Sequence, residues 1–366
     1  MAKTNDAERY AVATQMQLTW WRFRRHKLAM VSLFIVALFY LLAVGADFLA
    51  VSDPHEGDAR TSYIAPQPIH LFDDGSFRPY IYGLKGVRDV KTFKLIYTVD
   101  TSRKVYLEFF GHGYRYSFFG FDTDRHLLTL RDPRVTDGIH LLGTDLLGRD
   151  LWSRLMVASR VSLTIGLVGV SISLVLGVLL GGISAIRGGW VDNVIQRGIE
   201  VVRSLPTIPL WLGLAAALPN DWSVTQIYFA ITIIISLLAW TDLARVVRGK
   251  FLSLREEEFV MAAELAGASQ TRIIFHHMLP SFASHIIAAV SLALPAMIIS
   301  ETSLSFLGLG LRPPAISWGI LLQDAQNIQT LALAPWLLLS AVPVILVILA
   351  FNFLGDGLRD AADPYG

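Results

Sequence analysis

The longest run without a charged residue, Val161–Ile186, limits what this chain can fold into more than any other feature. A helix of about 20 apolar residues crosses the roughly 30 Å hydrocarbon core of a bilayer, and this run is longer than that. Of the 366 residues, 53% are hydrophobic and 17% are charged, whereas about a quarter of the residues of a soluble domain are charged. Because the apolar residues occur in such blocks, we expect a polytopic membrane protein.

Five further apolar blocks bring the number of expected spans to six. Residues 1–27, which precede the first block, are mostly polar. A cleaved signal peptide, the alternative for that block, has only a short basic region before its apolar core. The glycines and serines of the longest run permit close packing between helices. The five blocks are Leu28–Ala46, Ile199–Leu218, Ile227–Asp242, Ser281–Thr302 and Leu331–Gly355.

The distribution of lysine and arginine predicts the orientation in the membrane. The stretch 245–272 carries five of these residues, and the loop 219–226 carries none. Positive charge is enriched in cytoplasmic loops, although segments longer than about 60 residues, such as 47–160, escape this rule. Both termini are therefore expected in the cytoplasm, and the segment 47–160 is expected on the other side.

The segment between the first two spans has the pattern of a small β-rich domain. Four stretches in it alternate between polar residues and β-branched or aromatic ones, which is typical of strands. Turn sequences are expected at 73–75 and at 111–113. No catalytic constellation is recognisable in this insertion. The four expected strands are Lys91–Val99, Lys104–Phe110, Tyr114–Phe121 and His126–Leu130.

Composition argues against several kinds of site. The chain has no cysteine, so disulfides, thiolate zinc sites and iron–sulfur clusters are excluded. The net charge is +1, without the basic excess of a nucleic-acid binder. His276 and His277 are adjacent and point about 100° apart on a helix, which disfavours a shared metal ion. No Gly-x-x-x-x-Gly-Lys-Ser/Thr sequence for binding ATP occurs.

The polar stretch 256–280, between the fourth and fifth spans, combines the features of a docking helix. Ala262 and Ala263 are small enough for close approach, and Gly267 is free to take the positive φ of a helix end. Leu279-Pro280 is then expected to mark the return to the membrane. The pattern fits a cytoplasmic helix that enters a socket on a soluble partner, or, alternatively, an ordinary amphipathic loop helix.

This stretch resembles the EAA loop, with which ABC importer permeases dock on their ATP-binding subunit. Three further stretches, 140–163, 203–209 and 301–319, are similar to the peptide-importer branch of that family. They contain, in this order, the sequences Gly-Thr-Asp-Leu-Leu-Gly-Arg-Asp, Arg-Ser-Leu-Pro and Glu-Thr-Ser-Leu-Ser-Phe-Leu-Gly. With its long insertion, the chain looks most like the subgroup that imports microcin C or long peptides.

Two positions depart from the family pattern. Met261 stands where the family has glutamate, and His277 replaces the usual isoleucine. A salt bridge from position 261 is thereby excluded. Glu264 lies one helical turn further on, and Glu257 and Glu258 precede the helix, so an acidic contact in a different register is still possible.

The resemblance implies an all-α polytopic membrane protein with six transmembrane helices and the type I ABC importer permease fold. A small β-rich extracytoplasmic insertion separates the first two helices, and the protein is expected to be a multi-pass protein of the bacterial inner membrane. The expected divisions are a cytoplasmic amphipathic segment (1–27), the first transmembrane helix (28–50), the insertion (51–158), a five-helix core (159–355) that contains the coupling loop, and a cytoplasmic tail (356–366).

The resemblance also implies roles for individual residues. Coupling to the ATPase is expected of Glu257, Glu258, Met261, Ala262, Ala263, Glu264, Gly267 and Ala268. The translocation path or its gate is expected at Arg203, Pro206, Pro209, Glu301 and Ser305. Contact with a substrate-binding protein is expected at Trp318, Asp145 and Arg149.

For some of these residues a structural role is the stronger interpretation. Arg203 and Asp242 lie near the cytoplasmic ends of neighbouring spans, so an ion pair between them, or snorkelling of their side chains to lipid headgroups, is favoured over substrate contact. Glu301 is favoured as a buried group that serves a backbone partner. The stretch 143–150 is favoured as a tight turn at the start of the second span.

The implied function is the permease subunit of an ATP-driven importer for peptides, paired with a homologous permease. Two cytoplasmic ATP-binding subunits hold ATP and magnesium, and an extracytoplasmic substrate-binding protein delivers the peptide. This chain is then a non-catalytic subunit without a cofactor. Two alternatives are a permease for nickel or another small solute, and a membrane enzyme with a catalytic outer domain.

Overall fold

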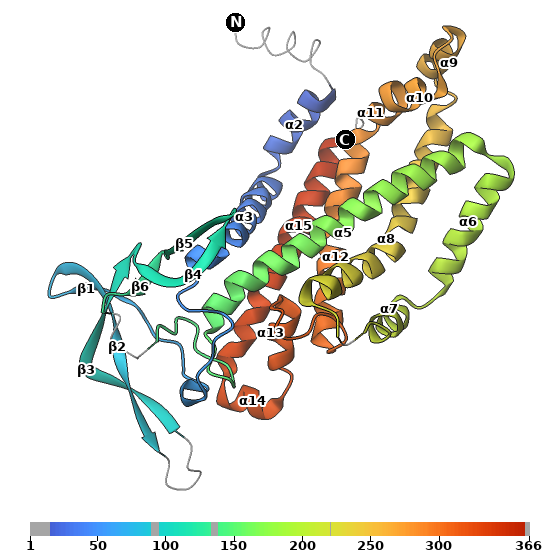
Figure 1. Ribbon diagram of the computed structural model, residues 1–366. Helices are drawn as coiled ribbons and strands as arrows, with labels where there is room; N and C mark the ends of the chain where they lie inside the picture. Colours follow the sequence, from blue (N-terminus) through green and yellow to red (C-terminus); the bar gives the residue numbers. More distant parts are fainter. Residues whose placement is uncertain (1–14, 89–94, 133–137, 220, 363–366) are drawn as a thin grey trace, which may run out of the picture. The chain divides into compact units, whose positions relative to one another are not determined.

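The computed structural model describes residues 15–88, 95–132, 138–219 and 221–362 (Figure 1). The start of the predicted amphipathic segment, part of the first predicted strand and the last residues of the predicted tail lie outside these ranges. The longer helices are α2 (Gln15–Arg25), α3 (Lys27–Val44), α5 (Leu151–Arg187), α6 (Gly189–Ser204), α7 (Thr207–Ala216), α8 (Val224–Leu254), α12 (Ala283–Phe306) and α15 (Ala341–Ala362).

Shorter elements connect these helices. The short helices are α4 (Ala46–Leu49), η1 (Ala59–Thr61), α9 (Glu258–Leu265), α10 (Gln270–Arg272), η2 (Ile273–Met278), α11 (Leu279–Ser281), α13 (Trp318–Asp324), α14 (Ile328–Leu333) and η3 (Pro335–Ser340). The strands are β1 (His70–Asp73), β2 (Ser76–Arg88), β3 (Leu95–Phe109), β4 (His112–Phe118), β5 (Phe121–Arg125) and β6 (Leu128–Leu130).

Within the described residues, five helices are long and apolar enough to cross a membrane, and a bent pair raises the number to as many as six. The third predicted span, Ile199–Leu218, is not one straight helix. It is divided between α6 and α7, which meet at an angle of 87°. Pro206 lies at the break; it has no backbone N–H and disfavours the helical conformation of Leu205 before it.

Several helices extend beyond the apolar runs that predicted them. Helix α5 begins at Leu151, inside the stretch predicted as insertion, because the Asp150 carboxylate accepts hydrogen bonds from the N–H and the Oγ of Ser153, both at 2.7 Å. Helix α8 continues past Asp242 to Leu254. Helix α15 continues to Ala362, so the predicted tail starts within a helix.

The chain forms two compact units. Unit 1 consists of the described parts of Met1–Leu38, Thr164–Glu301 and Leu346–Gly366, and unit 2 of those of Phe39–Leu163 and Thr302–Ile345. Small residues bring the helices of unit 1 together. A Cβ added at Gly181 would meet the backbone oxygen of Ala244 at 2.5 Å, so α5 and α8 approach closely there.

Unit 2 contains all the described strands. An antiparallel sheet has the order β1-β2-β3-β6, and β4 pairs with β5 in a separate hairpin. Where the sequence predicted two strands, β3 is continuous, and the register with β2 shifts between Tyr82 and Gly83. The sequence did not predict β2, which contains Pro79, Gly83 and Gly86, residues that disfavour strands. The core of the sheet is Ile81, Val105, Leu107, Leu128 and Ile139.

Two turns of two residues close the hairpins of unit 2. In the β1–β2 turn, Asp74 and Gly75 have φ values of 45° and 81°. In the β4–β5 turn, Phe119 and Gly120 have φ values of 49° and 87°. Both turns therefore have the two positive φ values of type I′. The turn predicted at 73–75 is confirmed, whereas the one predicted at 111–113 is wrong, because its last two residues belong to β4.

Candidate functional site

The predicted docking helix is α9, and a glycine ends it. Gly267 has a φ of 75°, and its N–H donates to the Glu264 oxygen at 2.9 Å. The Ala268 N–H donates to the Ala263 oxygen at 3.0 Å. These bonds satisfy carbonyl groups that the end of a helix leaves without an intrahelical partner. The prediction that Gly267 ends this helix is confirmed.

One side of α9 packs on unit 1, and the other side is open. Val260 is buried with Phe251, Ile273 and Met278, and Ala263 and Ala268 pack against this cluster. Leu265 is 90% exposed and Met261 is 45% exposed. Contiguous exposed apolar side chains are typical of a surface that another protein covers. The exposed residues of this segment are Glu257, Glu258, Phe259, Met261, Ala262, Glu264, Leu265, Ala266 and Gly267.

The helix that follows α9 contains a wide turn that the sequence did not predict. Residues Ile273–Met278 are π-helical, and the Leu279 N–H donates to the Ile274 oxygen five residues earlier. π-Helical turns are rare in proteins, and those that occur are often found at functional sites. Pro280 lies inside the helical segment, and the chain bends only at Phe282, just after the predicted point of return to the membrane.

His276 and His277 lie on this wide turn, with ring centroids 5.4 Å apart and an interplanar angle of 88°. Across the part of the chain that the structure describes, no three His, Asp or Glu side chains are grouped so that they would hold a metal ion. The two histidines therefore do not form a metal site with neighbouring acids in this structure.

Unit 1 contains a cavity of about 520 Å³ between α5, α6, α7, α8 and α12. This volume is in the range of ligand pockets. The wall is mainly apolar, and its charged residues are Arg203 and Asp242, which form an ion pair. Their side chains are 41% and 76% exposed, so the pair is open to solvent at the cavity. The predicted ion pair between these residues is confirmed.

The other residues predicted for the path do not line this cavity. Pro206 precedes α7 and Pro209 lies in its first turn, and both are exposed, while Thr207 and Trp211 of the same helix line the cavity. Glu301 is fully buried in unit 1, and its role on the translocation path or its gate stays a prediction.

Ser305 is also fully buried, and its role in unit 2 is structural. Its Oγ accepts a hydrogen bond from the N–H of Leu311 at 3.1 Å, just beyond the end of α12. A Cβ at Gly310 or Gly319 would meet atoms of Ser305 at 2.5 Å and 2.6 Å, respectively. Three positions of the 301–319 motif therefore pack on one another, which corrects the prediction of Ser305 as a path residue.

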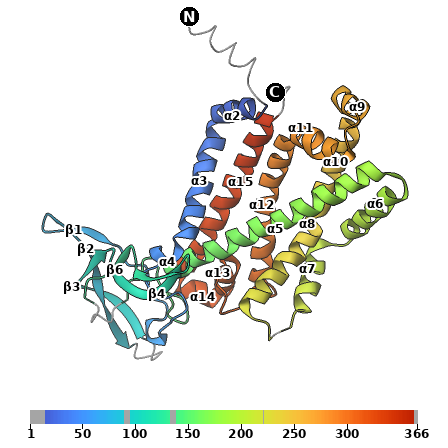
Figure 2. The same ribbon diagram turned by 45° about the horizontal axis from the view of Figure 1, so that its top comes forward.

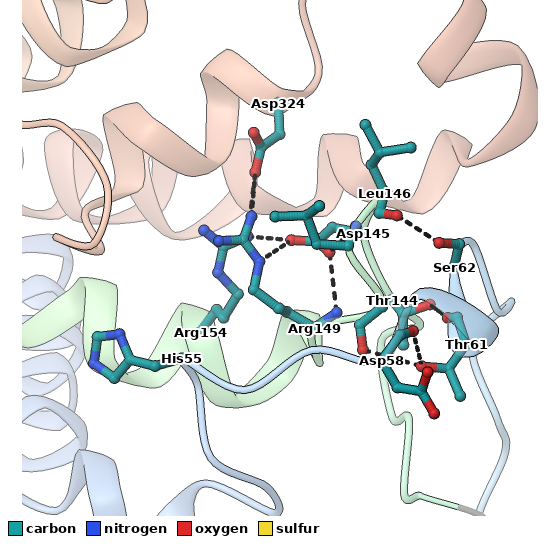
Figure 3. A network of polar contacts seen from close by, with 12 residues as sticks. His55, Asp58, Thr61, Ser62, Thr144, Asp145, Leu146, Arg149, Arg154 and Asp324 are labelled. Atoms are coloured by element: carbon teal, nitrogen blue, oxygen red, sulfur yellow. Dashed lines mark hydrogen bonds and ion pairs between the residues drawn. The ribbon is translucent and has the colours of Figure 1, made fainter.

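Two of the predicted binding-protein contacts belong to a charged network in unit 2 (Figure 3). The Asp145 carboxylate accepts a hydrogen bond from Nε of Arg149 at 2.8 Å and is paired with the guanidinium of Arg154. Arg154 also lies 3.2 Å from the Asp324 carboxylate on α13. The side chains of Arg154 and Asp145 are 1% and 2% exposed. A charge that is buried this deeply destabilises the protein unless an opposite charge lies beside it.

Asp324, at the edge of this network, is 36% exposed. Burial raises the pKa of its carboxyl group above the usual value, and the positive charges of Arg154 and Arg149 offset only part of this effect.

Asp145 also shapes the turn 143–150. Its Oδ1 accepts the N–H groups of Leu147 at 2.9 Å and of Arg149 at 3.0 Å. Gly143 and Gly148 have φ values of 80° and 72°, and a Cβ at Gly148 would meet the Asp58 oxygen at 1.9 Å. The prediction of a tight turn before the second span is confirmed.

Trp318 was expected to contact a binding protein, but its side chain is 0% exposed. Its backbone N–H donates to Ser162 Oγ at 3.1 Å, and its Nε1 donates to Ser159 Oγ at 3.2 Å. Phe39 meets its ring edge to face at 6.3 Å. Trp318 and the buried Asp145 are therefore core residues of unit 2, and of the three expected contacts Arg149, 17% exposed, is the one that reaches the surface.

Comparison with known proteins matches two families to this chain. The family described as "Binding-protein-dependent transport system inner membrane component" matches residues 173–365. The family described as "N-terminal TM domain of oligopeptide transport permease C" matches residues 14–66. Together the two matches cover the first span and most of the remaining ones, and leave the β-rich segment of unit 2 outside.

Individual relatives are similar over the same regions. The oligopeptide transport system permease protein OppC of Haemophilus influenzae is 39% identical over 251 residues, 68% of this chain and 78% of that protein. OppC of Escherichia coli is 38% identical over 249 residues, 68% of this chain and 80% of that protein. OppC of Bacillus subtilis is 35% identical over 240 residues, 65% of this chain and 75% of that protein.

One solved structure, of inward facing conformations of the MetNI methionine ABC transporter, is 18% identical and has a TM-score of 0.41 over 55% of this chain and 93% of that chain. A TM-score below 0.5 does not establish that two chains share a fold. The family of this chain is instead established by the family match, which covers more than half of the chain, and by the 39% identity to a permease of which 78% is covered. The chain belongs to the family of inner membrane permease components of binding-protein-dependent ABC transport systems.

Proposed function

We propose that this chain is a permease subunit of an ATP-driven importer whose cargo is a peptide. The support for the cargo is the identity of 35–39% to permeases that are named for oligopeptide transport. In this family the permease is non-catalytic and ATP is hydrolysed by a separate subunit. The long β-rich segment between the first two spans supports the microcin C or long-peptide subgroup as the finer assignment.

The proposed complex contains a homologous second permease, two ATP-binding subunits that hold ATP and magnesium, and a substrate-binding protein. In the proposed topology, six helices of the type I fold cross the inner membrane, with the bent pair α6 and α7 as the third. Both termini and α9 are cytoplasmic, and the β-rich insertion is extracytoplasmic. This orientation rests on the positive charge of the stretch around α9 and of the N-terminal segment.

The observation that carries the coupling role is the open side of α9. Phe259, Met261 and Leu265 expose apolar side chains on a helix whose other side is anchored in the core of unit 1. A partner that covers this side gains apolar contact and, by moving, transmits force through Val260 into the cluster beneath it. Alternating access then follows from relative motion of the bundled helices.

Replacing Gly267 by valine tests this role. A β-branched residue is strained at a φ of 75°, so the end of α9 changes shape, and we expect ATP-driven peptide uptake to be lost while the chain still enters the membrane. Gly75→Val is the matched control: its φ is 81°, its surroundings are equally open, and it lies in the β1–β2 turn. Wild-type uptake by Gly267→Val, at equal amounts of protein in the membrane, would rule out the docking role.

The cargo is tested separately. Purification of the complex followed by mass spectrometry of bound molecules should identify peptides. In proteoliposomes, unlabelled peptides should compete for uptake and nickel salts should not. Competition by nickel without competition by peptides would replace the peptide by a small solute and leave the coupling role of α9 untouched.

A further inference from the structure

Two hairpins of unit 2, β1–β2 and β4–β5, have the same turn geometry and opposite chemistry. The β1–β2 turn is polar: its four residues are Asp73, Asp74, Gly75 and Ser76. The β4–β5 turn is aromatic, with the residues Phe118, Phe119, Gly120 and Phe121. Asparagine or aspartate before glycine is the favoured choice for type I′ turns, whereas a bulky residue at positive φ is strained. The phenylalanine at position 119 therefore works against the turn that contains it.

The phenylalanines of this turn are unusually open to solvent. The side chains of Phe118, Phe119 and Phe121 are 39%, 79% and 78% exposed. The other aromatic group of the insertion is exposed to a smaller extent: Phe77 stacks on Phe109 at 6.1 Å and meets Phe72 at 5.7 Å, and the three side chains are 58%, 42% and 64% exposed, respectively. Exposure of neighbouring rings at a protruding turn indicates an apolar partner for the turn.

The base of the aromatic hairpin is attached to the end of a membrane span. Asp47 and Phe48 lie in α4, directly after the apolar helix α3. The Leu127 N–H donates to the Phe48 oxygen at 2.8 Å, and Nδ1 of His126 lies 2.8 Å from the Asp47 oxygen. The Asp47 carboxylate pairs with Arg160 at 2.6 Å, which marks the polar level where the span ends. The hairpin is thus fixed at the boundary between hydrocarbon and water.

The exposed phenylalanines lie on the side of the hairpin that faces this boundary. The rings of Tyr114 and Tyr116 lie 4.5 Å and 5.1 Å from the ring of His126, and the Tyr114 hydroxyl is 3.5 Å from the Asp47 oxygen. Alternation along a strand places Phe118 on the same side as Tyr116, and Phe118 pairs with Phe121. Figure 2 shows β4 close to α4, which follows α3.

The opposite side of the hairpin is polar. Ser117 pairs with Asp122 there, one residue away from the aromatic pair on each strand. The end of α3 that belongs to unit 2 also exposes apolar side chains, with Leu41 at 68% and Val44 at 48%. Apolar side chains that are exposed both at the end of a transmembrane helix and on the aromatic turn of the hairpin attached to it, with a polar side on the hairpin, have the pattern of an interfacial element.

We propose that the β4–β5 hairpin is a lipid anchor, whose turn residues Phe118, Phe119 and Phe121 enter the boundary between headgroups and acyl chains of the leaflet at which α3 ends. The anchor fixes the β-rich insertion against the membrane surface. This inference is independent of the cargo and requires only that α3 crosses the bilayer.

The natural sequence makes the test direct, because it has no cysteine. Phe119→Cys and Asp74→Cys occupy equivalent positions of the two type I′ turns, and each takes one nitroxide spin label. The full-length chain is reconstituted into liposomes of phosphatidylethanolamine and phosphatidylglycerol. Electron paramagnetic resonance power saturation then compares collision with oxygen, which concentrates in lipid, and with a nickel chelate, which stays in water.

We expect the oxygen-to-nickel collision ratio at position 119 to be several-fold higher than at position 74. Phe121→Cys, with Ser76→Cys as its partner control, repeats the comparison at positions where the backbone is extended and guards against a local effect of the substitution. A label at 119 and 121 that meets the nickel chelate as freely as at 74 and 76 would overturn the proposal. A label shielded from both reagents would also overturn it, because it would show contact with protein.

Discussion

Arg154 of unit 2 and Arg203 of unit 1 each face an aspartate, but in different surroundings. Arg154 and its partner Asp145 are 1% and 2% exposed, whereas Arg203 and its partner Asp242 are 41% and 76% exposed. Taking charges out of water is expensive, so the buried pair is held only while both partners are present. The exposed pair is screened by water and contributes little to stability.

The difference separates a structural role from a functional one. The buried pair connects the turn before α5 to α13, and no charged cargo reaches it. The open pair lies at a cavity of ligand size, and we propose that either charge exchanges its partner there for a charged end of a peptide. Substitutions should therefore affect the folding of one cluster and the transport properties of the other.

The largest effect on stability is expected from Asp145→Asn. The amide keeps the oxygen that accepts the backbone N–H groups but removes the charge that faces Arg154. Arg154 then keeps only Asp324, which is 36% exposed, so we expect a loss approaching the roughly 3–5 kcal/mol that a buried charge without a partner costs. Unfolding of the purified chain in detergent micelles measures this loss. A change below about 1 kcal/mol would place the pair in the same class as an exposed one.

A smaller effect is expected from Asp324→Asn, because this carboxylate is 36% exposed and Arg154 retains Asp145. At neutral pH the change in the free energy of unfolding should stay below about 1 kcal/mol, because the raised pKa of Asp324 means that burial of its charged form offsets the attraction to Arg154 and Arg149. A loss as large as that of Asp145→Asn, measured under the same conditions, would show that Arg154 depends on both carboxylates equally.

The raised pKa of Asp324 also predicts a pH dependence. A carboxyl group with a higher pKa in the folded state binds protons more tightly there, so its contribution to stability is greatest at low pH. That contribution is lost as the pH rises from the ordinary aspartate value through the raised pKa. The melting temperature of the natural protein minus that of Asp324→Asn should therefore fall over this interval. A difference that rises with pH would contradict the assignment.

The smallest effect on stability is expected from Asp242→Asn, at about 0.5 kcal/mol. Uptake is the informative measurement for this variant. If the pair at the cavity exchanges with charged ends of the cargo, the KM for peptides should rise while the amount of protein in the membrane stays constant. A loss of stability similar to that of Asp145→Asn would abolish the distinction between the two clusters.

Local signals in the sequence were sufficient for part of the fold. Uninterrupted apolar runs located the spans, Gly267 located the end of α9, and Asp74-Gly75 located a hairpin turn. Each of these features depends on residues that are neighbours in the chain, so periodicity and backbone preferences are enough. The pairing of Arg203 with Asp242 was also accessible, because both charges lie near the ends of apolar blocks.

Features that depend on distant residues were not accessible in this way. Trp318 is buried against Ser159 and Ser162, and Arg154 meets Asp324, which lies 170 residues further along the chain. A tryptophan or a charge in a polar loop gives no sign of such partners. The Phe119-Gly120 turn was missed for a different reason, since phenylalanine is not a residue that turns favour.

The bend at Leu205 and Pro206 has a consequence for topology. Helix α7 has 10 residues and α6 has 16, so at about 1.5 Å per residue each is shorter than the roughly 30 Å of a hydrocarbon core. Only the two together are long enough to count as one crossing. In the proposed topology the bent pair is one of six crossings, and an even number of crossings returns the polypeptide to the side of the membrane from which it started.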